Sequence, residues 1–118
     1  MTQDDPPAVE GVVDLLGRCG TGPLWGMAST DLNATLLAWP SGQGVAEHVN
    51  AELDVLLVVL DGRASAIIDG ACHDLAGGSA ILIPRGTRRA ITAGDRGVRY
   101  LSVHRRRGPL QIQASPEG

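Results

Sequence analysis

The chain has 118 residues, a formal net charge of -3, 43% hydrophobic residues and 19% charged residues. This length suits one domain with a modest hydrophobic core, and the composition argues against a disordered chain. Nothing in it approaches the roughly 18 consecutive apolar residues of a membrane span, and the acidic balance does not indicate nucleic-acid binding. We therefore expect one globular domain with neither a membrane nor a nucleic acid as partner.

The two ends of the chain are predicted to be tails around a single domain. Residues 1–10 are acidic and contain Pro6 and Pro7, which is typical of a flexible segment. We place the domain at 11–110 and a second tail at 111–118. The N-terminal residues have neither a basic nor a long apolar stretch, so no secretory signal is expected, and Cys19 and Cys72 form no paired motif. These features predict a cytoplasmic protein.

Between these ends, short apolar segments alternate with turn residues. A piece at 11–16 is predicted to be either an edge strand or a helical turn. The predicted strands are 24–28, 32–39, 54–60, 64–68, 71–75, 80–83, 88–92 and 98–104. Asp69-Gly70 is a strong hairpin signal, and 93–97 is predicted to be a loop. Short strands at such spacing indicate an all-β sandwich or barrel.

The densest apolar run, 55–60, has consequences for assembly. Both of its alternating faces are apolar, so the face that points away from the core needs a cover. Either the N-terminal segment from Val12 to Trp25 or a second copy of the chain could supply it. We expect the second copy, and hence a homodimer.

Two stretches around this run resemble the sequence motifs of cupins, a family of small β-barrel proteins. The first motif is Gly, five residues, His-x-His, three or four residues, Glu, six residues and Gly. The second is Gly, five residues, Pro-x-Gly, two residues, His, three residues and Asn. The matching residues here are Gly42, His48, Gly62, Gly78, Pro84 and Gly86. The resemblance implies a small single-domain cupin of the cupin-2-like kind, folded as a double-stranded β-helix, the jelly-roll barrel.

The chain departs from the motifs at the positions that would bind a metal ion. Asn50, Val55 and Arg89 stand where the family has its second His, its Glu and its third His, and Ala93 replaces the Asn. An amide oxygen is a weak ligand, valine offers none, and arginine brings a permanent positive charge. We therefore expect neither a metal ion at the usual site nor any cofactor.

Arg89 suggests a different chemistry. The motif position places its guanidinium inside the barrel, beside His48 and Asn50, where a buried charge needs a partner. Either Glu52 or Asp54 supplies it in a structural ion pair, or a small ligand supplies it through a carboxylate, phosphate or enolate group. In the second case Arg89 would bind the anion, with His48 as a neutral donor or acceptor.

The predicted pocket combines these polar residues with apolar walls. Its ligand-binding residues are predicted to be His48, Asn50, Val55, Leu57, Arg89, Tyr100 and His104. Further walls are expected from Val59 and Ile91, and Ser102 shares a strand face with Tyr100 and His104. The leading hypothesis is a protein that binds a small anionic molecule in a metal-free barrel.

An enzyme is the alternative. It would be an isomerase or cyclase that uses His48 as acid or base, or a metal-dependent oxygenase with unusual ligands. A purely structural dimer is the third possibility. Whether the protein catalyses any reaction stays open at this stage.

Overall fold

The computed structural model describes residues 12–106 as a protein built of β-strands, without a helix in that range. The strands are β1 (Gly22–Ala28), β2 (Leu32–Trp39), β3 (Gly44–Val49), β4 (Val55–Ile68), β5 (Ala71–Ala76), β6 (Ala80–Ile83) and β7 (Arg88–Arg105). The predicted tails, and the predicted domain limits at 11 and 110, lie outside the described residues. Within that range, no helix is long and apolar enough to cross a membrane.

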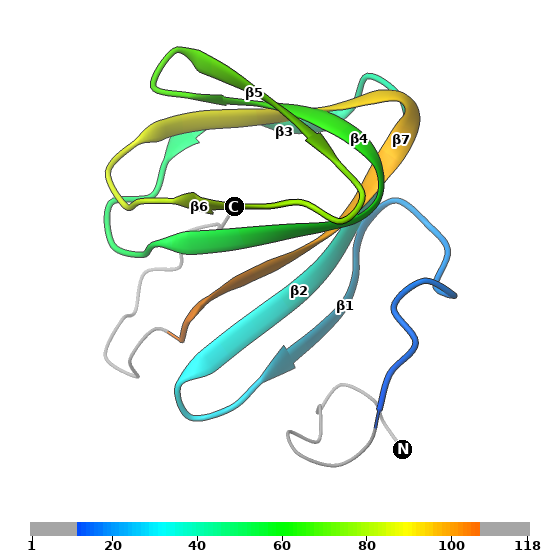
Figure 1. Ribbon diagram of the computed structural model, residues 1–118. Coiled ribbons are helices and arrows are strands. Elements are labelled where there is room, and N and C mark those ends of the chain that lie inside the picture. Colours follow the sequence, from blue (N-terminus) through cyan, green and yellow to red (C-terminus); the bar gives the residue numbers. More distant parts are fainter. Residues whose placement is uncertain (1–11, 107–118) are drawn as a thin grey trace.

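The strands form two facing layers that share β4 and β7 (Figure 1). One layer contains β1, β2, the second half of β7, the first half of β4, and β6. The other contains β3, the first half of β7, the second half of β4, and β5. All neighbouring strands are antiparallel. This arrangement is a jelly-roll barrel and confirms the predicted all-β class.

The long strands β4 and β7 correct the sequence prediction. We expected 54–60 and 64–68, and likewise 88–92 and 98–104, to be separate strands, but each pair is one continuous strand. Both strands bend from one layer into the other, with register shifts between Val59 and Asp61 and between Gly62 and Ala64. The turn residues therefore produce a bulge rather than a break, because the two strands bend together and stay paired.

Glycine makes this bend possible. Gly62 has φ of 84°, and a Cβ atom there would overlap the carbonyl oxygen of Gly97. Gly97 itself has φ of 80°. We call the end of the barrel at Gly62 and Gly97 the closed end. The opposite end, where β4 begins at Val55 and finishes at Ile68, is the open end (Figure 1).

Other local predictions had mixed outcomes. The Asp69-Gly70 hairpin is confirmed, and both residues have positive φ, 49° and 86°, as a tight hairpin turn requires. β3 was not predicted, because its apolar residues Val45, Ala46 and Val49 do not alternate regularly with polar ones; pairing with β7 holds it in the sheet. The piece at 11–16, as far as the structure describes it, forms neither a strand nor a helix, and the Asp14 side chain accepts hydrogen bonds from the backbone of Leu16 and Gly17.

The inner faces of the two layers pack into one core. Its buried members are Val55, Leu57, Val59, Ala64, Ala66, Leu75, Ile83, Ile91, Ala93, Val98 and Tyr100. They come from β4, β5, β6 and β7, so the core lies mainly on that side of the barrel. The side formed by β1, β2 and β3 contributes none of these residues and borders a cavity in the barrel interior.

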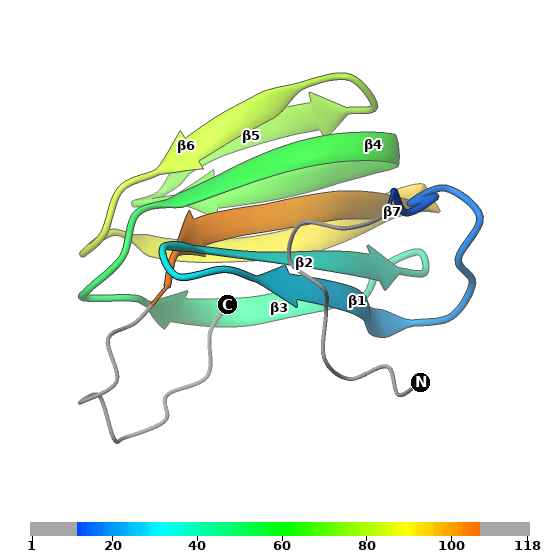
Figure 2. The same cartoon turned by 90° about the horizontal axis from the view of Figure 1, so that it is seen from below.

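The outer face of the first layer is also apolar. Figure 2 shows β6, β4, β7, β2 and β1 side by side. Two neighbouring rows of outward side chains cross all of these strands without a charged residue. They are Met27, Ala34, Val103, Leu56 and Leu82, and Trp25, Leu36, Leu101, Val58 and Ala80. In these rows Leu56 is 38% exposed and Leu82 is 57% exposed.

Candidate functional site

The open end of the barrel holds an arginine inside the protein. Strand pairing brings Arg89 of β7 next to His48 of β3 on the inner face, and Arg89 is only 1% exposed. Its Nε donates a hydrogen bond to Nε2 of His48 at 3.2 Å. Nδ1 of His48 lies 2.9 Å from the carbonyl oxygen of Ala46. Since Nε2 accepts, Nδ1 carries the proton and donates to Ala46, which describes a neutral imidazole.

The rest of the guanidinium has no partner. Both terminal nitrogens of Arg89 are buried, and neither has a hydrogen-bond acceptor among residues 12–106. Loss of hydration on burial lowers the pKa of Arg89. Arginine nevertheless stays protonated near neutral pH, because its ordinary pKa is so high. The barrel therefore contains a positive charge with unused donors.

The expected hydrogen-bonded pair between Arg89 and an acid does not form at the terminal nitrogens of Arg89. Oδ1 of Asp54 instead accepts a hydrogen bond from the backbone nitrogen of Arg85 at 2.9 Å, which ties the loop before β4 to the turn after β6. Among residues 12–106, neither Asp54 nor Glu52 accepts a hydrogen bond from the terminal nitrogens of Arg89.

The residues at the motif positions do not suit a metal ion. His48 already accepts from Arg89, and Oδ1 of Asn50 accepts from the backbone nitrogens of Glu52 and Leu53 at 3.0 and 3.1 Å. Val55 belongs to the core. From residue 12 to 106, no three His, Cys, Asp or Glu side chains are grouped so that they could bind a metal ion. A divalent cation beside Arg89 would also be repelled.

A cavity in the barrel interior lies next to Arg89 rather than around it. It has a volume of about 400 Å³. Its walls are Pro23, Asn33, Thr35, Leu37, Trp39, Val45, Leu57, Ile91, Tyr100, Ser102 and His104. Ile91 follows Arg89 by two residues on the inner face of β7, so their Cα atoms are about 7 Å apart along the strand.

The predicted pocket residues thus separate into three groups. Leu57, Tyr100 and His104 line the cavity, as does Ile91. His48 and Arg89 form a buried pair beside it. The remaining residues do not line this cavity: Val55 and Val59 pack in the core, and Oδ1 of Asn50 accepts hydrogen bonds within its own loop.

Four polar side chains face the cavity from two adjacent strands. Asn33 and Thr35 of β2 pair with His104 and Ser102 of β7, respectively. Sequence reasoning did not select Asn33 or Thr35. A signal existed, because the two residues alternate with Ala34 and Leu36, which places both on one face of a strand. Nothing in the sequence said that this face points inward.

Aromatic side chains form the deeper part of the cavity. Nε1 of Trp39 donates a hydrogen bond to the hydroxyl of Tyr100 at 3.1 Å. Burial raises the pKa of Tyr100, and the indole donor offsets part of this rise. The phenol is therefore neutral at physiological pH. Together with Leu37 and Leu57, these rings give an apolar wall beyond the polar residues.

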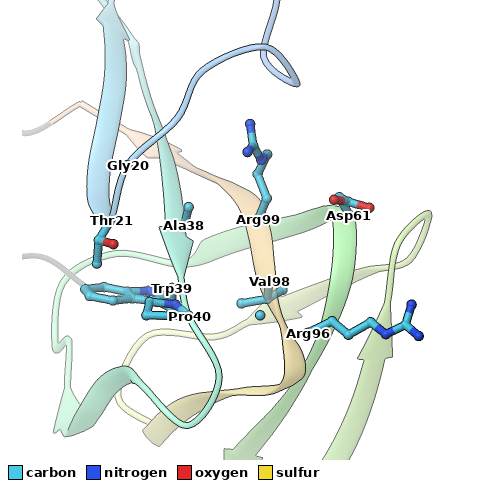
Figure 3. A pocket seen from close by; sticks show the side chains of 10 residues that line it. Gly20, Thr21, Ala38, Trp39, Pro40, Asp61, Arg96, Val98 and Arg99 are labelled. Carbon is cyan, nitrogen blue, oxygen red and sulfur yellow. The ribbon is translucent and has the colours of Figure 1, made fainter.

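A smaller hollow of about 190 Å³ lies at the closed end (Figure 3). Arg96 and Arg99 both line it, and Figure 3 shows their side chains diverging. Nη1 of Arg99 donates to the carbonyl oxygens of Leu15, Leu16 and Arg18, at 2.9, 3.1 and 2.8 Å. Of the two arginines that line this hollow, Arg99 holds the N-terminal segment.

Comparisons with known proteins agree with the architecture. No family model matches the chain, and no curated protein matches its sequence. Among solved structures, a protein from Bacillus halodurans is 23% identical with a TM-score of 0.73, over 92% of this chain and 89% of that one. A cupin protein from Bacteroides fragilis is 20% identical with a TM-score of 0.69, over 92% of both chains.

A protein with a cupin-2 domain from Shewanella frigidimarina is a third similar structure. It is 17% identical with a TM-score of 0.64, over 77% of this chain and 86% of that one. At such identities the likeness concerns the fold alone. The barrel described above has the fold of a small cupin.

Proposed function

We propose that this chain, a small barrel of the cupin fold, binds a small anionic molecule in its interior, with Arg89 as the partner of the anion. The observation that carries the proposal is the pair of buried, unbonded terminal nitrogens on Arg89. An unpaired buried charge costs several kcal/mol unless a partner compensates it. A carboxylate or phosphate group fits the flat fork of guanidinium donors better than any other partner.

The neighbouring cavity provides room for the remainder of such a ligand. Its volume of about 400 Å³ lies within the usual range for small-molecule sites. Most of the cavity wall is apolar. One wall residue, Ile91, lies on the same face of β7 as Arg89 and two residues after it. We expect the anionic group to meet the guanidinium after a change of the Arg89 rotamer, while the apolar part of the ligand occupies the cavity.

Binding has better support than the enzymatic alternatives. Both ring nitrogens of His48 are engaged, one by Arg89 and the other by Ala46, so His48 lacks a free site for acid or base catalysis. The donor set for a metal-dependent oxygenase does not fit a metal ion either. Neither alternative is favoured by a specific observation.

Calorimetric titration with valerate and with inorganic phosphate tests the proposal. We expect at least one of them to bind the wild-type protein, and Arg89→Met to weaken that binding by at least tenfold. Arg88→Met is the matched control, because Arg88 is the adjacent residue on the outer face and pairs with Glu47 at 3.4 Å. Equal binding by wild type and Arg89→Met would contradict the proposal.

We also propose that two copies of the chain pair through the apolar outer face of the first layer. The described part of the N-terminal segment lies against the closed-end side of this layer, where Arg99 binds it, and Leu36 is fully buried, but Leu56 and Leu82 remain 38% and 57% exposed. Five strands about 4.8 Å apart and two rows of side chains about 7 Å apart give roughly 340 Å² of apolar surface. A standard interface takes about 800 Å² from each partner, so residues around the two rows would have to contribute the remainder.

Sedimentation velocity tests the pairing. We expect a dimer for the wild-type protein and a monomer for Leu82→Asp, because a carboxylate at this position would be desolvated in the interface. His73→Asp is the control, because His73 is exposed on β5, away from this face. A monomeric wild-type protein would disprove the homodimer.

A further inference from the structure

We infer that the polar group Asn33, Thr35, Ser102 and His104 recognises a second, neutral group of the same ligand, so that the ligand is a short hydroxy- or oxo-carboxylate. This inference rests on the proposed function, because it assumes that Arg89 holds the carboxylate. It concerns the part of the ligand that Arg89 does not bind.

The first support is the unused hydrogen-bonding capacity of these side chains. Within residues 12–106, the side chains of Asn33, Thr35 and Ser102 bond no other residue. His104 uses only Nδ1, which lies 2.9 Å from the carbonyl oxygen of Arg105, so its other ring nitrogen is unengaged. Ser102 is nearly buried, at 8% exposure, and borders the cavity. Among the described residues, only the terminal nitrogens of Arg89 are both buried and unbonded, so the unused polar atoms of these four side chains are accessible from the cavity that they line, where water or a ligand can bond them.

The second support is their arrangement. Strand pairing sets Asn33 opposite His104 and Thr35 opposite Ser102, which makes two adjacent pairs on the inner face. The next pair toward the closed end is Leu37 with Tyr100, where the cavity becomes apolar. The polar part is thus confined to two pairs at the open end. Such a compact set of donors and acceptors matches one hydroxyl or carbonyl group rather than a fully polar ligand.

The third support is the position of the polar group relative to Arg89. Val55 pairs with His104 and Ile68 pairs with Arg89, and these two residues are the opposite ends of the bent strand β4. His104 and Arg89 therefore lie at the same end of the barrel but in facing layers (Figure 1). Facing sheets pack about 10 Å apart, and the side chains reach into this gap from both sides. A short ligand can span the remaining distance.

These features define the chemical class. The carboxylate would bind Arg89, an oxygen a few carbons away would bind the polar group, and the carbon chain would pack against Leu57 and Ile91. A fatty acid would leave the polar group unsatisfied, and a sugar would leave polar hydroxyls against the apolar wall. Neither chemistry uses the whole site.

Calorimetric titration with a matched series of probes tests the inference. The series consists of valerate, its α-, β- and γ-hydroxy derivatives, levulinate, and methyl levulinate as the uncharged member. We expect at least one hydroxy or oxo acid to bind the wild-type protein about tenfold more tightly than valerate, from one added buried hydrogen bond. Methyl levulinate should bind more weakly than levulinate.

Two variants assign the gain to the polar group. Thr35→Val and Ser102→Ala remove a hydroxyl with little change of shape, and each should lower the ratio of the affinity for the preferred hydroxy or oxo acid to the affinity for valerate. Thr92→Val is the matched control, because Thr92 lies on β7 with its side chain exposed outside the barrel. Thermal melting checks that all variants fold.

The outcomes separate the two proposals. If valerate binds through Arg89 and no hydroxy or oxo acid binds better, the present inference is wrong and the proposed function stands. The same holds if the preference survives in both Thr35→Val and Ser102→Ala. If methyl levulinate binds as well as levulinate and Ser102→Ala weakens both, the role of Arg89 is wrong. If no member of the series binds, the hydroxy- or oxo-carboxylate class is wrong, and the phosphate titration decides on Arg89.

Discussion

Two arginines of β7 at opposite ends of the barrel differ in how their donors are used. Arg99, at the closed end, places one terminal nitrogen among three carbonyl oxygens of the N-terminal segment. Arg89, at the open end, gives one hydrogen bond to His48 and leaves both terminal nitrogens unbonded, although it is far more deeply buried. The chain thus supplies backbone acceptors to Arg99, which holds the N-terminal segment, but supplies none to the terminal nitrogens of Arg89 among residues 12–106.

The difference teaches where to look for function. A guanidinium that stabilises a fold is expected to be satisfied, because unbonded buried donors lower stability. Arg89 departs from this rule inside a barrel that also contains a cavity. If the proposed function holds, the open end gives up stability for a ligand, whereas the acceptors around Arg99 at the closed end stabilise the fold. The following variants test this contrast.

The largest effect is expected at the closed end. Gly62→Ala should destabilise the fold by more than about 3 kcal/mol, because Gly62 has φ of 84° and a methyl group would overlap the backbone of Gly97. Urea denaturation measures the change. Gly70→Ala is the control, since its φ of 86° is similar but nothing lies within 4 Å of the added carbon. Equal losses in the two variants would show that backbone strain, and not the close approach of β4 and β7, decides the bend.

At the open end, removing the charge should increase stability. Arg89→Met is expected to raise the free energy of unfolding of the ligand-free protein by about 1 to 3 kcal/mol, because an apolar side chain replaces a buried unpaired cation. Loss of the donor to His48 limits the gain. Urea denaturation of this variant and of Arg88→Met provides the comparison. A marked destabilisation by Arg89→Met alone would mean that Arg89 is structural after all.

At Arg99, removal of the charge should change the free energy of unfolding in the opposite direction. Arg99→Met should lower stability by about 1 to 2 kcal/mol, because three carbonyl groups lose a charged donor. Amide hydrogen exchange should become faster in the segment 14–18. Arg96→Met is the control, since Arg96 borders the same hollow but bonds no residue between 12 and 106. Unchanged exchange in Arg99→Met would contradict the role of Arg99 in holding this segment.

The smallest effect concerns the tyrosine in the cavity wall. Burial raises the pKa of Tyr100 above its ordinary value of 10.0, so the folded state holds the phenolic proton more tightly than the unfolded state. Its contribution to stability is thus fully present below about pH 10 and is lost as the pH rises through the folded-state pKa, at up to about 1.4 kcal/mol per pH unit.

Urea denaturation between about pH 9 and 11 measures this dependence. Tyr100 is the one tyrosine of the chain, so no other phenol titrates in this range. Tyr100→Phe should flatten the alkaline part of the profile, after allowance for the bond that Trp39 loses. An identical alkaline decline in Tyr100→Phe would assign the dependence to other groups.

Much of the fold was predictable from local sequence. Apolar segments separated by glycine, proline and Asp-Gly turns specify short strands, because alternation and turn conformation depend on neighbouring residues. The structure also explains why the motif has glycine at position 62, where φ is positive and a side chain would overlap the backbone of Gly97. Local pattern could not show that β4 and β7 are each one continuous strand. In the sequence, Gly62 and Gly97 look like strand ends, but in the structure β4 and β7 bend together there and stay paired.

The candidate site was predictable only in part. The sequence alone determined that an arginine replaces an imidazole at position 89, because a fixed charge without a lone pair is a property of the residue itself. Only the tertiary structure decided that the terminal nitrogens of Arg89 lack an acceptor among residues 12–106, that Asn50 bonds its own loop while Asp54 bonds the turn at Arg85, and that Asn33 and Thr35 face the cavity. These facts depend on which segments, distant along the chain, meet across the barrel and which face of each strand turns inward.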